Sequence, residues 1–411
     1  MLRVVSLGAA LAALLLGTGP AVSAAVLPED TVPAVAPAAT RAATRAAVPG
    51  GGEERWALDV VNAAAAWKVT KGAGVVVALL GGGQPDSGLP ELAGRVEHGP
   101  DMTGTVFGDE TQRPGDDATA LASLIAGSGS GGGLSGVAPE ARVLSLPVVV
   151  NRPERDYVDP EERPEETRDS PLARGIRYAA AQGAKVICLP VPAYGVDRVE
   201  RDAISFALTR GAVLVAAVGD AGQSEYARQN GTSFWAFPAG YPGVVGVGAV
   251  DRRGGKTSGS SDNLSVLVAA PGERVPVALP GGRRGTASGT GVASAIVAGT
   301  IALIKAKYPD LPPELVSRAL TATSRPHPPA GYDDKVGFGV VDAAAALAKA
   351  GELVGYGQAS AVQDDAHFGK GPVSRAPARP GPDPVRLWVY GIAIVLGIGG
   401  FCAGALALSR R

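Results

Sequence analysis

The chain has 411 residues, of which 46% are hydrophobic and only 5% aromatic, and its formal net charge is −1. This length accommodates one large α/β domain of about 300 residues with appendages, or two domains of about 150 residues. The near-zero charge provides no basic field for nucleic acid and no charged surface for an anionic partner, so we expect no nucleic-acid ligand.

The N-terminus has the pattern of a secretory signal peptide, assigned to residues 1–24. Arg3 supplies the charged start, an apolar run covers 4–17, and small residues at 22–24 suit cleavage. An uncleaved membrane helix is the alternative, but the apolar run is short and is followed by Gly19-Pro20. Residues 25–52 are rich in Ala and Pro and lack periodicity, which predicts a spacer.

Residues 53–351 alternate between apolar strand-like runs and helix-like stretches, which predicts one domain. The predicted strands are Val75–Leu80, Arg142–Leu146, Lys185–Leu189, Ala212–Val218 and Val244–Val250. The predicted helices are Thr119–Ala126, Leu172–Gln182, Val199–Arg210, Val292–Lys307 and Pro313–Thr323. Nearly continuous apolar strands that alternate with helices indicate an α/β fold, a doubly wound parallel sheet with helices on both faces.

A charged insertion interrupts this pattern at Asn151–Ser170. Its net acidic composition and its prolines leave too few apolar residues for a core, so we expect a solvated loop. A docking loop for a basic partner is the alternative function for the same segment.

The C-terminal part predicts a membrane anchor. Residues 352–384 are rich in Pro and Gly and are expected to form a stalk, and 385–408 form an apolar run long enough to span a bilayer. Arg410 and Arg411 lie in the tail 409–411, and positive charge after a span predicts a cytoplasmic tail with the bulk of the chain outside. The alternative, a buried core helix, is disfavoured because 387–408 contain no charge. Cys188 and Cys402 fall in different predicted environments, so no disulfide is expected.

Several short segments in a fixed order resemble the subtilisin-like serine proteases (subtilases), and most closely the mycosins, which are membrane-anchored subtilases associated with type VII secretion. The matching segments are 56–59, 66–75, 92–96, 135–141, 247–251, 268–273 and 336–342. The predicted signal peptide and single C-terminal span also fit the mycosin plan. The resemblance covers nearly 300 residues, and it implies the peptidase family S8 fold.

An active subtilase uses a Ser nucleophile, a His base, an Asp that orients the His, and an Asn that stabilises the oxyanion. The resemblance implies that these positions correspond to Gly291, Asp117, Gly81 and Asp220 in this chain, respectively. A glycine has no side chain that could attack a carbonyl, and an ionised Asp220 would repel the anion that an Asn stabilises. The resemblance therefore predicts a degenerate site without catalytic residues.

Displaced catalytic groups are the alternative. Ser288 and Ser294 flank Gly291, and His98, His327 and His367 are the three histidines of the chain. None of these histidines lies near the three motifs in sequence, and catalysis is very sensitive to misplacement of about 1 Å.

The segment that holds the substrate peptide in the family corresponds to Pro190–Pro192 in this chain. Proline donates no backbone hydrogen bond, so we expect strand addition along this segment to be crippled. Alternatively, the prolines protect an exposed edge.

The two carboxylates of the site also have ordinary explanations. Asp116 or Asp117 precedes a predicted helix and is a good candidate for its N-cap, and Asp220 follows a strand as a turn residue. A sharper alternative is that Asp117 and Asp220 face each other and bind a cation or share a proton.

Nucleotide binding is an alternative class of function. Gly81–Gly83 follow a strand and Gly127–Gly132 satisfy a GxGxxG pattern, but neither lies between a strand and a helix with the required spacing.

The sequence therefore predicts a membrane-anchored, extracellular, mycosin-like protein that has lost its triad and acts as a scaffold or binding component. We expect no cofactor and no metal, and a protein partner at the membrane, for which the resemblance suggests the type VII secretion machinery. A serine endopeptidase with displaced catalytic groups is the alternative function.

Overall fold

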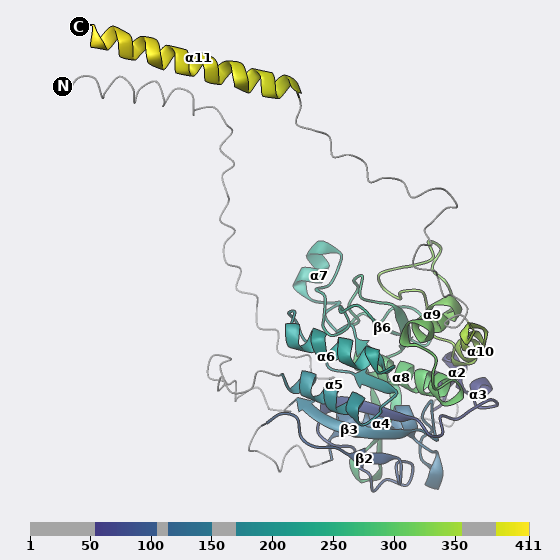
Figure 1. Ribbon diagram of the computed structural model, residues 1–411. Coiled ribbons are helices and arrows are strands. Elements are labelled where there is room, and N and C mark those ends of the chain that lie inside the picture. The colour runs from purple at the N-terminus through teal and green to yellow at the C-terminus, as the bar shows by residue number, and fades with distance from the viewer. Residues whose placement is uncertain (1–53, 105–113, 150–169, 356–383, 411) are drawn as a thin grey trace. The chain divides into compact units, whose positions relative to one another are not determined.

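The computed structural model describes residues 54–104, 114–149, 170–355 and 384–410, shown in colour in Figure 1. The predicted signal peptide, the spacer, nearly all of the acidic insertion and most of the stalk lie outside the described residues. The chain divides into two compact units, residues 1–357 and 358–411. Each unit is described by itself.

The first unit is built on a seven-stranded sheet in the order β2-β3-β1-β4-β5-β6-β7, in which every neighbouring pair is parallel. The strands are β1 (Val76–Gly82), β2 (Val96–His98), β3 (Arg142–Val149), β4 (Val186–Leu189), β5 (Val213–Ala217), β6 (Val244–Val250) and β7 (Val268–Pro271). A separate antiparallel hairpin pairs β8 (Val275–Leu279) with β9 (Arg283–Ala287).

Helices cover both faces of this sheet (Figure 1). The helices of the first unit are α2 (Trp56–Val60), α3 (Ala63–Ala66), α4 (Asp116–Ala126), α5 (Pro171–Ala181), α6 (Arg198–Thr209), α7 (Glu225–Asn230), α8 (Thr290–Lys307), α9 (Pro313–Thr323) and α10 (Ala343–Leu353). This arrangement confirms the predicted doubly wound fold.

The two faces of the sheet contribute side chains to two separate hydrophobic cores, because successive side chains of a strand point to opposite faces. In β4, Val186 and Cys188 belong to the core that α4, α8 and α10 cover, whereas Ile187 and Leu189 belong to the core beneath α5 and α6. Both sets are fully or almost fully buried. A strand buried on both faces explains why the sequence shows continuous apolar runs in place of alternation.

Two helices in the described residues are long and apolar enough to cross a membrane, α8 and the helix of the second unit, α11 (Pro384–Ser409). They differ in burial. Of the α8 segment, 89% is buried inside the first unit, whereas none of Trp388–Ser409 is buried. Helix α8 is therefore a core helix, and α11 fits the single membrane span that the sequence predicts.

Candidate functional site

The ends of three neighbouring strands bring the predicted site residues to one edge of the sheet. Strands β1, β4 and β5 are adjacent and parallel, so their carboxyl ends share an edge. Gly81 is the second-last residue of β1, and Asp220 lies three residues after the end of β5. Helix α8 starts at the same place, because the Gly219 amide donates a hydrogen bond of 3.1 Å to Oγ1 of Thr290.

Gly291 lies in the first turn of α8 and is packed against the residue that follows β4. A Cβ atom added to Gly291 would lie 2.8 Å from the carbonyl oxygen of Pro190 and 3.4 Å from its Cβ. Contacts below about 3 Å between such atoms force a shift of the backbone. A Cβ at Gly81 would meet Cγ of Pro190 at 3.8 Å, an ordinary contact. Pro190 therefore fills the space between the two glycines.

The side chain of Asp220 binds the N-terminus of α8. Its Oδ1 accepts a hydrogen bond of 2.9 Å from the backbone amide of Thr290. The N-cap residue, Gly289, has φ 124° and no capping side chain, and a Cβ there would lie 2.9 Å from Oδ2 of Asp220. A carboxylate is favourable here because the free amides and the dipole of the helix attract negative charge. Asp220 thus supplies the negative charge at this helix terminus from another part of the chain.

Asp117 lies in the first turn of α4, near the end of β1, because the Gly115 amide donates a hydrogen bond of 2.9 Å to the Gln84 carbonyl. The prediction that Asp116 or Asp117 caps this helix is wrong. Gly115 is the N-cap, and no side chain makes a capping hydrogen bond. The helix extends one turn further back than the apolar pattern suggests, which places both aspartates inside it.

The two aspartates of this turn have different surroundings. Asp116 forms an ion pair with Arg283 at 2.6 Å. Asp117 is half-buried, and this burial, together with the nearby charge of Asp116, raises its pKa from 3.8 to about 6. The carboxyl group of Asp117 therefore titrates in the mildly acidic range.

The serines that flank Gly291 make structural hydrogen bonds. Ser294 is fully buried and its hydroxyl donates to the Gly291 carbonyl at 2.7 Å, while its Oγ lies 3.8 Å from Sγ of Cys188. The Ser288 hydroxyl accepts a hydrogen bond of 2.8 Å from the Arg274 amide. Both hydroxyls are thus engaged with the backbone of their own surroundings.

The histidines in the described residues contact backbone carbonyls elsewhere. Nε2 of His98 lies 3.2 Å from the Pro85 oxygen, and Nδ1 of His327 lies 3.0 Å from the Phe338 oxygen. His367 lies outside the described residues. Among residues 54–355, leaving out the undescribed stretches, no hydrogen bond joins a histidine to Ser288 or Ser294.

The segment that follows β4, Pro190–Ala193, does not form an open strand edge. Pro190 and Pro192 are buried, and the next residue, Ala193, exchanges two backbone hydrogen bonds of 2.7 and 2.8 Å with Phe237. The hydroxyl of Tyr194 lies 3.4 Å from a Cβ built at Gly219, and burial and the charge of Asp220 raise the pKa of this tyrosine. The prolines thus pack inside the molecule and do not shield an exposed edge.

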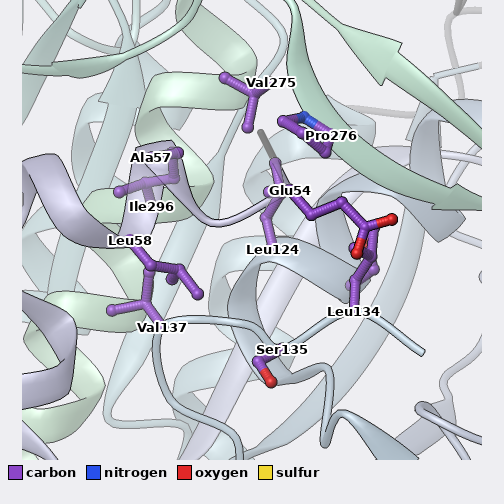
Figure 2. Close-up of a pocket in the computed structure, with 11 residues that line it drawn as sticks. Glu54, Ala57, Leu58, Leu124, Leu134, Ser135, Val137, Val275, Pro276 and Ile296 are labelled. Atoms are coloured by element: carbon purple, nitrogen blue, oxygen red, sulfur yellow. The ribbon is translucent and has the colours of Figure 1, made fainter. Parts of the chain in front are cut away.

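Two features elsewhere bear on the search for a ligand site. In the part of the chain that the structure describes, no group of three or more His, Cys, Asp or Glu side chains is arranged to hold a metal ion. A cavity of about 10 Å³ lies between the chain near Glu54, α2, α4, α8 and β8 (Figure 2). It has room for about one water molecule, and none of the four predicted site residues lines it.

Sequence reasoning missed two residues of this site. The sequence indicates only that Pro190 lacks a backbone amide hydrogen, whereas in the structure its carbonyl and ring occupy the space beside Gly291. Thr290 binds the Gly219 amide with its side chain and Asp220 with its own amide. In the sequence, only one feature points to a role of Thr290 in the site: it directly precedes Gly291 at the start of a long predicted helix.

A protein-family model and several known proteins align with this chain over most of its length. The subtilase family model matches residues 72–339. Mycosin-1 of Mycobacterium tuberculosis is 33% identical to the chain, over 89% of the chain and 88% of the relative. Thermitase of Thermoactinomyces vulgaris is 31% identical, over 59% of the chain and 79% of the relative.

Solved structures show the same similarity. The serine protease MycP1, described as an essential component of the type VII (ESX-1) secretion system, matches with a TM-score of 0.61 at 32% identity. That match covers 74% of this chain and 92% of the MycP1 chain. The MycP3 protease from the type VII (ESX-3) secretion system matches with a TM-score of 0.59 at 30% identity, over 74% of this chain and 91% of MycP3.

Proposed function

The chain belongs to the subtilase family, and from this premise we propose that it is a mycosin-like pseudoprotease. In this proposal Gly81, Asp117, Gly291 and Asp220 stand at the degenerate catalytic positions. The domain acts as a membrane-anchored scaffold or binding component outside the cell. The observation that carries the proposal is the contact of 2.8 Å between the Pro190 carbonyl oxygen and a Cβ built at Gly291.

This contact supports loss of the nucleophile in two ways. Glycine has no hydroxyl, and the space in which a serine side chain would begin is taken by a backbone atom. A backbone carbonyl is harder to displace than the end of a flexible side chain. Nucleophilic catalysis requires reacting atoms held within a few tenths of an ångström of the productive geometry, which the occupied position does not permit.

The position of Asp220 supports loss of the oxyanion site. A protease stabilises the negative charge that develops on the substrate oxygen with donors near the nucleophile, at the N-terminus of the helix that carries it. Here the carboxylate of Asp220 already accepts from the Thr290 amide at 2.9 Å. A second negative charge at the same helix terminus would be repelled by this carboxylate.

The proposed location and partner rest on α11 and on the relatives. A single apolar helix at residues 388–409 fits a membrane span, and the two arginines after it favour a cytoplasmic tail. MycP1 and MycP3 are proteases of type VII secretion systems. We assign this chain to the same kind of assembly, with a protein partner at the membrane and no nucleic acid.

A fluorophosphonate probe tests the chemistry. Such a probe labels activated serines, so we expect no labelling of the full chain in detergent, with the serine protease MycP1 as the positive control under the same conditions. Peptide cleavage should equal that of the buffer. Labelling that disappears in Ser288→Ala or Ser294→Ala would establish a displaced nucleophile and replace the pseudoprotease by the alternative endopeptidase.

Purification from native membranes tests the scaffold role. The full chain, with α11 retained, should co-purify with components of a type VII secretion apparatus. A chain that is inert toward the probe but purifies without any such component would keep the loss of catalysis and overturn the assignment to this assembly.

A further inference from the structure

Several exposed apolar side chains of the first unit come from α7 and from two loops that a ring contact and a hydrogen bond join to it. Of seven large hydrophobic side chains that are exposed in the described part of residues 54–355, four lie here: Tyr226, Phe234, Trp235 and Leu264. We call these four residues the aromatic surface. Trp235 and Phe234 are each 46% exposed and Leu264 is 69% exposed. Figure 1 shows α7 at the periphery of the first unit, beyond the helices that cover the sheet.

The aromatic surface is held in place by its own contacts. The rings of Tyr226 and Phe234 are stacked with their centroids 3.6 Å apart. The Phe234 carbonyl accepts a hydrogen bond of 3.0 Å from Nδ2 of Asn263, which fastens the loop of Phe234 to the loop of Leu264. Residue Ser224 caps α7 with a bond of 3.1 Å to the Ala227 amide. The surface is thus prebuilt, and little conformational entropy is lost when it binds.

Charges around the aromatic surface balance. Glu225 and Arg228 lie on the same short helix, and the nearby Asp262 forms an ion pair with Lys256 at 3.1 Å. This arrangement gives no net charge to select an acidic or a basic partner. Recognition at this surface therefore depends on apolar contact and on aromatic rings.

We propose that the aromatic surface inserts into the boundary between headgroups and acyl chains of the bilayer that α11 spans. Tryptophan, tyrosine and phenylalanine favour this boundary because their rings are apolar, and Trp and Tyr also carry a polar group that stays hydrated. The inference goes beyond the proposed function and needs only one part of it, the span.

The covalent link between the first unit and α11 favours the bilayer as the occupant of this surface. Residues 356–383 separate the first unit from α11, and these 28 residues extend at most about 100 Å. A tether of this length keeps the surface at a high effective concentration relative to the bilayer. Weak insertion of a few rings is then enough for docking.

Depth-dependent quenching of tryptophan tests the proposal on the full chain in phosphatidylcholine vesicles. The chain has four tryptophans: Trp56, Trp67, Trp235 and Trp388. The variant Trp388→Phe removes the reporter in the span, Trp56 is buried, and Trp67 is partly buried in the first unit. Lipid brominated near the headgroup should then quench part of the emission, more strongly than lipid brominated near the chain end. Further substitution Trp235→Phe should abolish this quenching.

Two variants complete the design. In the Trp388→Phe chain, the pair Phe234→Ser and Leu264→Ser should reduce the quenching of Trp235 at least twofold, because it removes apolar neighbours that are exposed and do not support the core. Val69→Ser, at another exposed apolar residue, should leave the quenching unchanged. Addition of anionic lipid or of salt should change the quenching little, since the surface carries balanced charge.

Three results would contradict the proposal, and they distinguish docking of the aromatic surface from the membrane span. A chain that floats with the vesicles but shows no quenching of Trp235 overturns the docking and leaves the span intact. A chain that does not float overturns the span and the docking together. Shielding of Trp235 from iodide in native membranes, with no shielding in lipid vesicles, assigns the surface to a protein and overturns the bilayer as occupant.

Discussion

At the scale of single residues, the carbonyl oxygen of Pro190 limits the side chain that position 291 can hold. A Cβ at this position would lie 2.8 Å from the Pro190 oxygen, so we expect Gly291→Ser to lower the free energy of unfolding by about 1–3 kcal/mol. Urea denaturation of the full chain in detergent measures the difference. The same variant should remain unreactive toward the fluorophosphonate probe, because restoring the hydroxyl does not restore a base.

Gly81→Ala is the matched control for this substitution. Its Cβ would meet Pro190 at 3.8 Å, and alanine in a strand is favoured over glycine, so this variant should be as stable as the wild type or slightly more stable. If Gly291→Ser and Gly81→Ala proved equally stable, Pro190 would not close the site.

The half-buried carboxyl group of Asp117 predicts a pH dependence of stability. Its pKa in the folded protein, about 6, exceeds the ordinary value of 3.8, so the folded state binds the additional proton between these values. The stabilisation is complete below pH 3.8 and is lost as the pH rises through 6. We expect Asp117→Asn to raise the melting temperature at pH 7 and to flatten its change between pH 4 and 7.

Asp116→Asn provides the comparison for Asp117→Asn in the same helical turn. This exposed residue pairs with Arg283, so its substitution should cause only a small change and leave the slope between pH 4 and 7 in place. An unchanged slope in Asp117→Asn would show that another group causes the pH dependence.

The sequence predicts four candidate site residues but does not predict their contacts. The distance between Gly291 and Pro190 depends on how the end of β4 meets the start of α8, and these segments lie about 100 residues apart in the chain. Likewise, the bond between Asp220 and the Thr290 amide joins a strand end to a distant helix. Sequence patterns carry the local periodicity of each segment, but they do not carry such tertiary distances.

At the scale of elements, strongly apolar or periodic segments were predicted well. Strand β6 and helix α9 have the boundaries that the sequence predicts, Val244–Val250 and Pro313–Thr323. The hairpin of β8 and β9 was missed, because Pro276 and Gly285 interrupt the usual strand composition. Helix α7 was missed because it has only six residues, with few of them apolar.

Helix α8 contains an unusual residue for a core helix, Lys305. The side chain is 2% exposed, and its Nζ donates to the Leu311 carbonyl at 2.6 Å. Burial lowers the pKa of this lysine from 10.5 to about 8. Between these values the unfolded chain binds more protons than the folded chain, so the contribution of Lys305 to stability should rise as the pH increases from 8 to 10.

Substitution by methionine tests this behaviour. The difference in melting temperature between the wild type and Lys305→Met should shift in favour of the wild type as the pH increases from 8 to 10. Lys307→Met, at an exposed position two residues later, should show no such shift. A constant difference for Lys305→Met across this range contradicts the lowered pKa.

At the scale of the whole molecule, the arrangement of one apolar helix and a large first unit predicts a topology. Because the two arginines after α11 favour a tail inside the cell, we expect protease added to intact protoplasts to release a fragment close to the size of the first unit. An antibody against that unit detects the fragment by gel electrophoresis. Protection of the unit until the protoplasts are lysed would reverse the orientation.

The contact between Pro190 and Gly291 also restricts the order in which substitutions can accumulate along a lineage. A Cβ at position 291 would lie 2.8 Å from the Pro190 carbonyl oxygen unless the chain after β4 moves first, so we expect the two positions to be energetically coupled. In the proposed pseudoprotease, peptide hydrolysis would require changes at several positions, and a change at position 291 would bring a structural cost without any catalytic gain. We therefore expect selection to retain this fold for its binding surfaces, because the first substitution toward hydrolytic activity would lower the stability of the fold.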